Sequence, residues 1–184
     1  MVFGLVILLL IAGVLAFLGV MYNSLVGLRV RADSAWSDID VQLKRRHDLI
    51  PNLVETVKGY AGHEKSTFEN VTKYRSMAMQ ATGPAERAEA EGQLTMALKS
   101  LFAVAENYPQ LRASENFSSL QKSLAEIEDN LQNARRYYNA VVRDLNTTIQ
   151  VFPSNLVAGL FRFQQRAFFE LGVAAERETP AVKF

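Results

Sequence analysis

The sequence predicts an all-α membrane protein: an N-terminal transmembrane helix, an elongated antiparallel four-helix bundle with long helices, and a short amphipathic C-terminal helix. Three observations predict this fold class. The chain begins with an apolar run, most of the remainder repeats apolar residues at helical spacing, and no sustained β-type alternation occurs. The expected organisation is a transmembrane anchor over residues 1–22, a bundle over 23–152, an amphipathic helix over 153–174 and a flexible tail over 175–184.

The apolar run covers residues 2–21 and contains no charged or hydrogen-bonding side chain. About 20 such residues in a helix cross the hydrocarbon core of a bilayer. A cleaved signal peptide is the alternative, but no basic residue precedes the run and no A-x-A-like site follows it. A buried soluble helix would normally show a polar face. Because Arg29 and Arg31 follow the run, the positive-inside rule places the N-terminus outside and the helical domain in the cytoplasm.

Four helices are expected after the anchor. The first runs from about Tyr22 to Ala61 and can continue directly from the span, the second covers about His63 to Gln80, and the third begins near Pro84 and stops before Pro109. The fourth helix, of about 36 residues after Ser114, has the strongest pattern. Its apolar seam comprises Phe117, Leu120, Leu124, Ile127, Leu131, Ala134, Tyr138, Val141, Leu145, Ile149 and Phe152. One such stripe needs partner helices, from this chain or another, which predicts a bundle and favours a homo-oligomer.

Composition argues against several function classes. The 20 basic and 19 acidic residues nearly balance, so no nucleic-acid partner is expected. The absence of cysteine excludes thiolate chemistry and cysteine-ligated metals. His63-Glu64 begins like a zinc-protease helix, but Thr67 stands where the second histidine belongs. We therefore expect no catalytic residue, metal or cofactor, and a protein that is not an enzyme.

A run of charged residues precedes a proline in the first soluble helix. Pro51 has no N–H and faces the carbonyl of His47, so a kink is expected there. One interpretation is a polar hinge or docking surface formed by Lys44, Arg45, Arg46, His47 and Pro51. The other, which the pattern favours, is a solvated face with some inward polar contacts.

The segment after Pro153 gathers apolar residues on one broad side, as expected for a helix from Leu156 to about Leu171. Such a helix can lie in a membrane interface or pack on the bundle or a neighbouring subunit. The residues expected at the membrane surface or subunit contact are Leu156, Leu160, Phe161, Phe163 and Phe168.

Several motifs resemble those of the LemA family of bacterial membrane proteins. The stretch from Ala35 to Tyr60, beginning Ala-Trp-Ser-Asp-Ile-Asp, resembles the family signature, and further blocks begin at Glu106, Ala134 and Phe152. The resemblance implies a single-pass protein with a mostly cytoplasmic or otherwise membrane-adjacent helical bundle, no known catalytic activity and no agreed catalytic residues. We expect the protein in the bacterial inner membrane. The resemblance also implies links to envelope proteases or envelope stress, and in one branch to internal membrane compartments.

These observations support two hypotheses about function. The first is a scaffold that self-associates on the lipid bilayer and organises or shapes it. The second is an adaptor that presents its bundle to an envelope protein such as a membrane protease. Particle size in mild detergent separates them, because a large homogeneous oligomer supports the scaffold and a monomer supports the adaptor. A ligand sensor or an enzyme is a third, disfavoured class.

Overall fold

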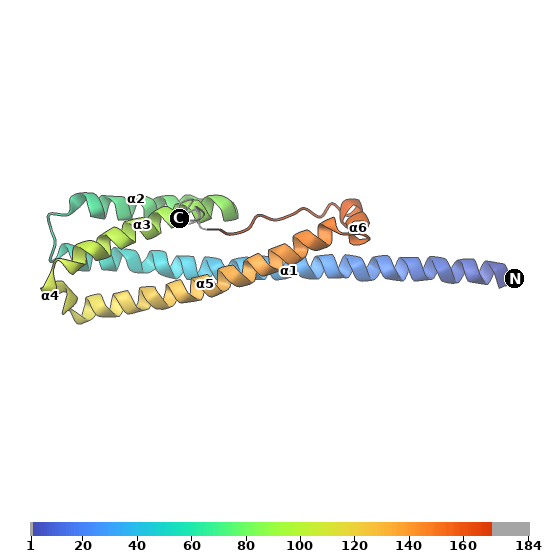
Figure 1. Cartoon of the computed structure of the whole chain (residues 1–184), viewed down its shortest axis with the longest axis horizontal. Coiled ribbons are helices and arrows are strands. Elements are labelled where there is room, and N and C mark those ends of the chain that lie inside the picture. The colour runs from blue at the N-terminus through green and yellow to red at the C-terminus, as the bar shows by residue number, and fades with distance from the viewer. Residues whose placement is uncertain (1, 171–184) are drawn as a thin grey trace, which may run out of the picture. The chain divides into compact units, whose positions relative to one another are not determined.

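The computed structural model describes residues 2–170, which contain helices and connecting segments but no strand (Figure 1). In chain order the helices are α1 (Val2–Lys58), α2 (Lys65–Gln80), α3 (Gly83–Glu106), α4 (Pro109–Arg112), α5 (Glu115–Gln150) and α6 (Ser154–Leu160). The predicted all-α class is confirmed. The single turn α4, which was not predicted, occupies the connection that Pro109 opens.

Helix α1 is continuous from the apolar run into the polar part of the chain, as expected. Its first segment is long and apolar enough to cross a membrane, and none of its 18-residue window of highest hydropathy is buried inside the protein. Leu5, Leu10 and Leu15 are therefore exposed in the protein alone. Water would disfavour such a surface, whereas the hydrocarbon core of a bilayer matches it.

The described chain divides into two compact units. Unit 1 comprises residues 2–39 and 134–167, and unit 2 comprises residues 40–133 and 168–170. Helices α1 and α5 each contribute a segment to both units, because the boundaries fall within these two helices.

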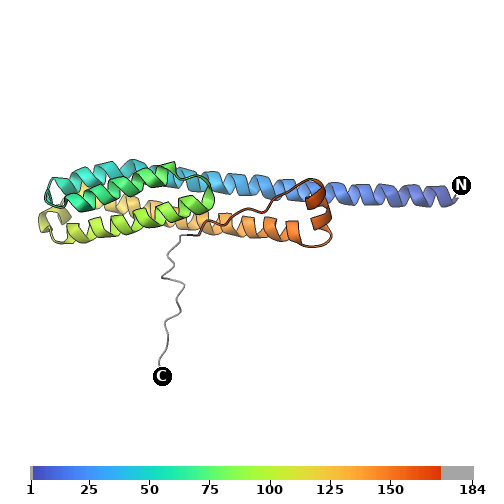
Figure 2. The same cartoon turned by 90° about the horizontal axis from the view of Figure 1, so that it is seen from above.

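Unit 2 contains α2, α3, the single turn α4 and segments of α1 and α5, and its core is a single apolar cluster. Helices α2 and α3 form an antiparallel pair in both views (Figures 1 and 2). The cluster includes Leu53, Val57, Val71, Leu94, Leu101 and Leu111. In α3, for example, the cluster members Leu94, Leu98, Leu101 and Ala105 follow at steps of four, three and four residues, which is the spacing that lets one face of a helix be buried.

The turn between α2 and α3 explains why α3 begins where it does. Gly83 has φ of +77°, a conformation that side chains with a Cβ rarely adopt. Thr82 donates its backbone N–H and its hydroxyl to Glu86 Oε2, at 2.9 and 3.0 Å. These hydrogen bonds lower the pKa of Glu86 because they favour its carboxylate form.

The predicted seam of α5 faces the protein interior. Phe117, Leu124, Ile127, Leu131, Tyr138, Val141 and Leu145 are buried, and Leu120, Ala134 and Ile149 are partly buried. Phe152, the last residue of the predicted seam, lies beyond the end of α5 and is exposed. The pattern is therefore correct along the helix and stops at the helix end.

The last helix is shorter than the interval 153–174 suggested. Helix α6 ends at Leu160, and the described chain beyond it is not helical. Arg162 adopts φ of +55°, and Arg162 N–H and Phe163 N–H donate to the carbonyls of Gly159 and Ala158 at 3.2 and 2.9 Å. This is a Schellman ending, which satisfies the last carbonyls and turns the chain away from the helix axis. Residues 171–184, which include the predicted tail, lie outside the described part of the chain.

Within unit 1, hydrogen bonds and an ion pair from three side chains hold the segment after α6 in place. Asn146 forms a pair of hydrogen bonds with the backbone of Arg166, at 2.8 and 2.9 Å. Tyr138 donates its hydroxyl to the carbonyl of Ala167 at 3.0 Å, and burial raises the pKa of Tyr138. Arg166 also forms a 2.6 Å ion pair with Asp33. The segment is thus held by both α1 and α5.

Candidate functional site

The residues predicted to contact membrane or a neighbouring subunit divide between the two units. Leu156, Leu160, Phe161 and Phe163 belong to unit 1, whereas Phe168 belongs to unit 2. Leu156 and Leu160 are 63% and 72% exposed, and Phe161 is also exposed. Phe163 is partly buried. The four residues of unit 1 therefore form the candidate site.

Helix α6 presents its larger apolar side chains outward because smaller buried residues occupy its inward face. Val157 and Ala158 are buried, and Ser154 is buried with its hydroxyl donating to the carbonyls of Thr148 and Val151, at 2.6 and 3.0 Å. Leu156 and Leu160 are four residues apart and share the opposite face. Together with exposed Val151, Phe152 and Phe161, they form what we call the α6 patch.

An aromatic cluster fixes the position of the α6 patch along α1. The ring of Phe161 lies 4.6 Å from that of Tyr22, and the ring of Phe163 lies 6.0 Å from it. Tyr22 is the first residue after the apolar run of residues 2–21. Figure 1 shows α6 beside α1, next to the end of α5. The patch therefore lies level with the point where the apolar run ends, which is where a membrane–water interface would fall.

The five residues of the predicted hinge or docking surface divide between surface and core. Lys44, Arg45 and Pro51 are exposed, whereas Arg46 and His47 are 4% and 7% exposed. The charged run thus does not form one continuous docking face. Its buried half fits the other interpretation, in which some polar side chains point inward.

Arg46 and His47 converge on Glu91 of α3, which is fully buried. Arg46 Nη1 lies 3.2 Å from Glu91 Oε2, and His47 Nε2 lies 2.6 Å from Glu91 Oε1. Arg46 Nη2 also donates to Thr95 Oγ1 at 2.8 Å and lies 3.6 Å from Glu128 Oε2. A buried charge requires partners of this kind, because an unpaired one would be strongly destabilising.

Pro51 adds a fourth helix to this buried cluster. Because Pro51 has no N–H, the carbonyl of His47 lacks its usual partner within α1. Arg75 Nε of α2 donates to that carbonyl at 2.8 Å. The cluster thus connects α1 to α2, α3 and α5, and its closed position in the core suits it to fixing the helix register.

Glu91 was not predicted from the sequence to be a core residue. A signal was nevertheless present. Ala88, Glu91 and Leu94 follow at steps of three on the buried stripe of α3. In α1, the buried residues Leu43 and Ile50 are seven residues apart, and Arg46 and His47 occupy the positions of the buried stripe between them.

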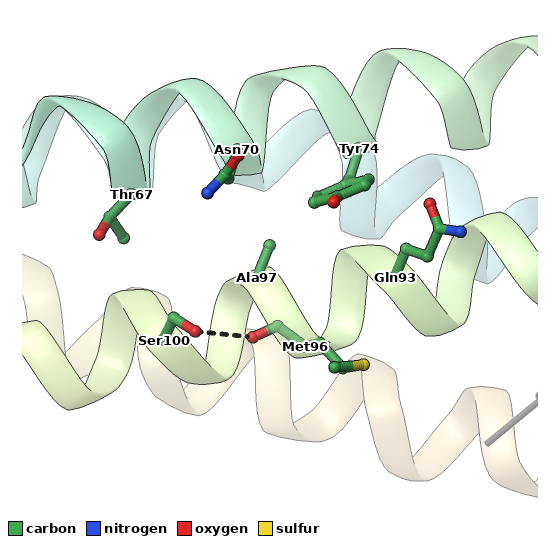
Figure 3. Close-up of a pocket in the computed structure, with 7 residues that line it drawn as sticks. All are labelled: Thr67, Asn70, Tyr74, Gln93, Met96, Ala97 and Ser100. Carbon is green, nitrogen blue, oxygen red and sulfur yellow. Dashed lines mark hydrogen bonds between the residues drawn. The ribbon is translucent and has the colours of Figure 1, made fainter. Parts of the chain in front are cut away.

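The groove between α2 and α3 offers no evident chemistry. Its volume is about 360 Å³, and Thr67, Asn70, Tyr74, Gln93 and Ser100 line it with uncharged polar groups (Figure 3). The hydroxyl of Ser100 donates to the carbonyl of Met96 at 3.2 Å. Within residues 2–170, no three His, Asp or Glu side chains gather in a way that could hold a metal.

Comparison with known proteins places the chain in a family. Magnetosome protein MamQ 2 of Paramagnetospirillum magneticum is 26% identical over 189 residues, covering 87% of this chain and 70% of the relative. Magnetosome protein MamQ of Magnetospirillum gryphiswaldense is 25% identical over 174 residues, covering 80% and 64%. Protein LemA of Metamycoplasma hominis is 27% identical over 152 residues, covering 80% and 68%. The model of the LemA family matches residues 35–184. The predicted resemblance is confirmed, and this membrane-associated helical protein belongs to the LemA family.

Proposed function

We propose that this protein is a non-enzymatic, membrane-anchored helical scaffold that self-associates and organises or shapes the bacterial inner membrane. The observation that carries the proposal is the α6 patch, whose exposed apolar residues lie level with the end of the apolar run of α1. A second apolar surface at this level gives the chain two attachments to the bilayer, one through the span and one through the interface.

Burial of the patch provides a driving force. Transferring a large apolar side chain from water is worth about 1.5–3 kcal/mol, and the patch contains five such residues. Monomeric soluble proteins usually avoid exposing contiguous surfaces of this kind. If several copies of the protein inserted their α6 patches into one leaflet, they would increase the area of that leaflet. Such an area difference between leaflets is a physical route to membrane bending.

The relatives are compatible with a role of this class. They are named magnetosome protein MamQ and Protein LemA, and neither name denotes a reaction. In this proposal the helical units lie in the cytoplasm, because Arg29 and Arg31 follow the span. A cysteine introduced at Ser37 tests this orientation, since the chain has no other cysteine. We expect it to resist an impermeant thiol reagent in intact cells, and labelling before lysis would contradict the orientation.

The scaffold itself is tested with full-length protein bearing Leu156→Gln and Leu160→Gln. Both side chains face away from the inward side of α6, so circular dichroism should report an unchanged fold. Light scattering in mild detergent and imaging of liposomes should show weaker assembly and less deformed membranes. Met77→Gln with Met79→Gln, which removes two exposed apolar side chains of unit 2, is the matched control and should change neither. A folded patch variant with unchanged assembly and unchanged liposomes would refute the scaffold.

The adaptor hypothesis has less support. It was motivated by a charged docking face, and the burial of Arg46 and His47 leaves only Lys44, Arg45 and Pro51 on that surface. A monomeric particle in mild detergent, with bound envelope protein in place of self-association, would favour it over the scaffold.

A further inference from the structure

Unit 1 contains a basic cavity beside the α6 patch. Its volume is about 290 Å³, and its lining includes Arg29 of α1 and Arg162 and Arg166 of the segment after α6. Leu145 and Phe163 supply apolar wall, and Gln164 and Gln165 supply neutral polar groups. No acidic side chain lines it.

The charges in this cavity are only partly neutralised. Arg166 pairs with Asp33 at 2.6 Å, but among residues 2–170 neither Arg29 nor Arg162 has a carboxylate within ion-pair distance. Arg29 instead lies over the ring of Phe163, 5.3 Å from its centre. Unit 1 as a whole has seven arginines and no lysine against three aspartates, a net charge of +4. A cavity of this kind selects for an anion.

Arg162 lines the cavity in an unfavourable backbone conformation. It occupies the left-handed conformation at the end of α6, where glycine is the residue usually found. Retaining an arginine at a position that favours glycine fits a role for the guanidinium itself. Arg166 is held by the paired hydrogen bonds of its backbone to Asn146. The backbone of two of the three arginines is therefore fixed by local hydrogen bonds.

Its position along α1 indicates which anion is within reach. Arg29 lies eight residues beyond Met21, or about 12 Å along the helix. Each headgroup layer is about 5–8 Å thick outside the hydrocarbon core. Helical side chains slant toward the helix N-terminus, which for α1 is the direction of the span, and a long arginine covers the remaining distance.

We propose that the cavity formed by Arg29, Arg162 and Arg166 binds the phosphate of an anionic phospholipid headgroup. The guanidinium groups of Arg29 and Arg162 donate hydrogen bonds to the phosphate oxygens, while the α6 patch contacts the acyl chains. This inference rests on the proposed placement of α6 at the membrane surface, and it names the lipid class that this surface recognises.

Full-length protein in neutral detergent provides the test. Calorimetric titration with dioctanoyl phosphatidylglycerol should show binding, while dioctanoyl phosphatidylcholine and inorganic phosphate should bind at least tenfold more weakly. Arg162→Gly removes the guanidinium while suiting the left-handed backbone, so misfolding does not explain its effect. We expect it to weaken phosphatidylglycerol binding about tenfold, and Arg29→Gln to do the same. Arg143→Gln is the matched control, an exposed arginine of unit 1 outside the cavity lining, and should change affinity less than twofold.

Three results would overturn the proposal. Equal losses of phosphatidylglycerol affinity in Arg162→Gly and Arg143→Gln would mean that the lipid is attracted by the general charge of the protein. Equal affinity for the two lipids would mean that the cavity does not select the headgroup. Equal affinity for inorganic phosphate would mean that the cavity binds a soluble anion. The titration measures neither self-association nor membrane deformation. Its failure is therefore distinguishable from failure of the scaffold, which the Leu156→Gln and Leu160→Gln variant tests separately.

Discussion

The two units place their charged side chains in different environments. In unit 2, Arg46 and His47 are buried against Glu91, although the unit as a whole has eleven basic and fourteen acidic residues, a net charge of −3. Unit 1 has a net charge of +4, and its ion pair between Arg166 and Asp33 is partly exposed. A buried ion pair constrains the helices that supply it, whereas exposed arginines remain available to a ligand. The difference suits unit 2 to structural stability and unit 1 to contact with the membrane.

The largest expected effect comes from the buried ion pair of unit 2. Glu91→Gln leaves Glu128, at 3.6 Å, as the one carboxylate that pairs with Arg46, beside the hydrogen bond to Thr95, and removes the carboxylate partner of His47. Leaving a buried charge unpaired costs about 3–5 kcal/mol. Asp33→Asn, which removes the exposed partner in unit 1, should cost less than about 1 kcal/mol. Denaturant unfolding of full-length protein in detergent measures both, and equal losses would show that the units do not differ in this way.

The second effect concerns apolar packing. Leu131 of unit 2 is almost fully buried, so Leu131→Ala should cost about 2–5 kcal/mol. Leu124→Ala should fall in the same range, whereas Gln121→Ala, at an exposed position of α5, should stay within about 0.5 kcal/mol. Leu160→Ala removes the same number of atoms from unit 1, yet it should also cost less than about 0.5 kcal/mol because Leu160 is exposed. Similar, small losses at Leu131 and Leu160 would contradict the burial assigned to the α5 seam.

A third, smaller effect has the opposite sign. Arg162→Gly relieves a left-handed conformation and should stabilise unit 1 by up to about 1 kcal/mol in thermal unfolding. The same substitution should weaken binding of anionic lipid. A variant that gains stability while losing lipid affinity would separate the two roles of this position. A loss of stability would mean that the arginine side chain is needed to hold the segment.

The smallest effect is a dependence on pH. Tyr138→Phe removes the hydrogen bond to the Ala167 carbonyl and should cost about 0.5–1.5 kcal/mol at neutral pH. Burial raises the pKa of Tyr138, so its contribution is complete below the ordinary tyrosine pKa of about 10. Above that pH the unfolded chain ionises first, and the contribution falls as the pH approaches the folded-state value. The stability difference between wild type and Tyr138→Phe should therefore narrow at alkaline pH, and a constant difference would contradict the role of the buried hydroxyl.

Periodicity explains how much of the fold could be predicted. The three- and four-residue steps of α5 identified its buried face, and Pro84 marked the start of α3. Both signals are local, because side-chain spacing and turn chemistry act within a few residues. Contacts between distant residues were harder to predict. Glu91 meets Arg46 and His47 across 45 and 44 residues, and nothing local indicates which carboxylate they select.

The end of α6 shows a different limit. The apolar side of residues 156–171 suits a helix, yet the helix ends at Leu160. Arginine is not a residue that predicts a left-handed helix end. The extended path is held by Asn146, Tyr138 and Asp33, which lie on other helices. Tertiary hydrogen bonds, together with the Schellman ending, thus override the local preference for helix. The membrane-contact prediction grouped Phe168 with Phe161 for the same reason, since both would share one face only if the helix continued.

The central claim is that the α6 patch lies in the membrane interface, and a depth measurement tests it most directly. The chain has no cysteine, so a single spin label can be placed at Leu160→Cys in unit 1 or at Met77→Cys in unit 2. Both positions are exposed in the protein alone. After reconstitution of full-length protein into liposomes, the label at position 160 should be shielded from a water-soluble relaxation agent and accessible to oxygen dissolved in lipid. The label at position 77 should be accessible to the water-soluble agent and shielded from the oxygen in lipid. Equal access of the water-soluble agent to both labels would contradict membrane contact by the α6 patch.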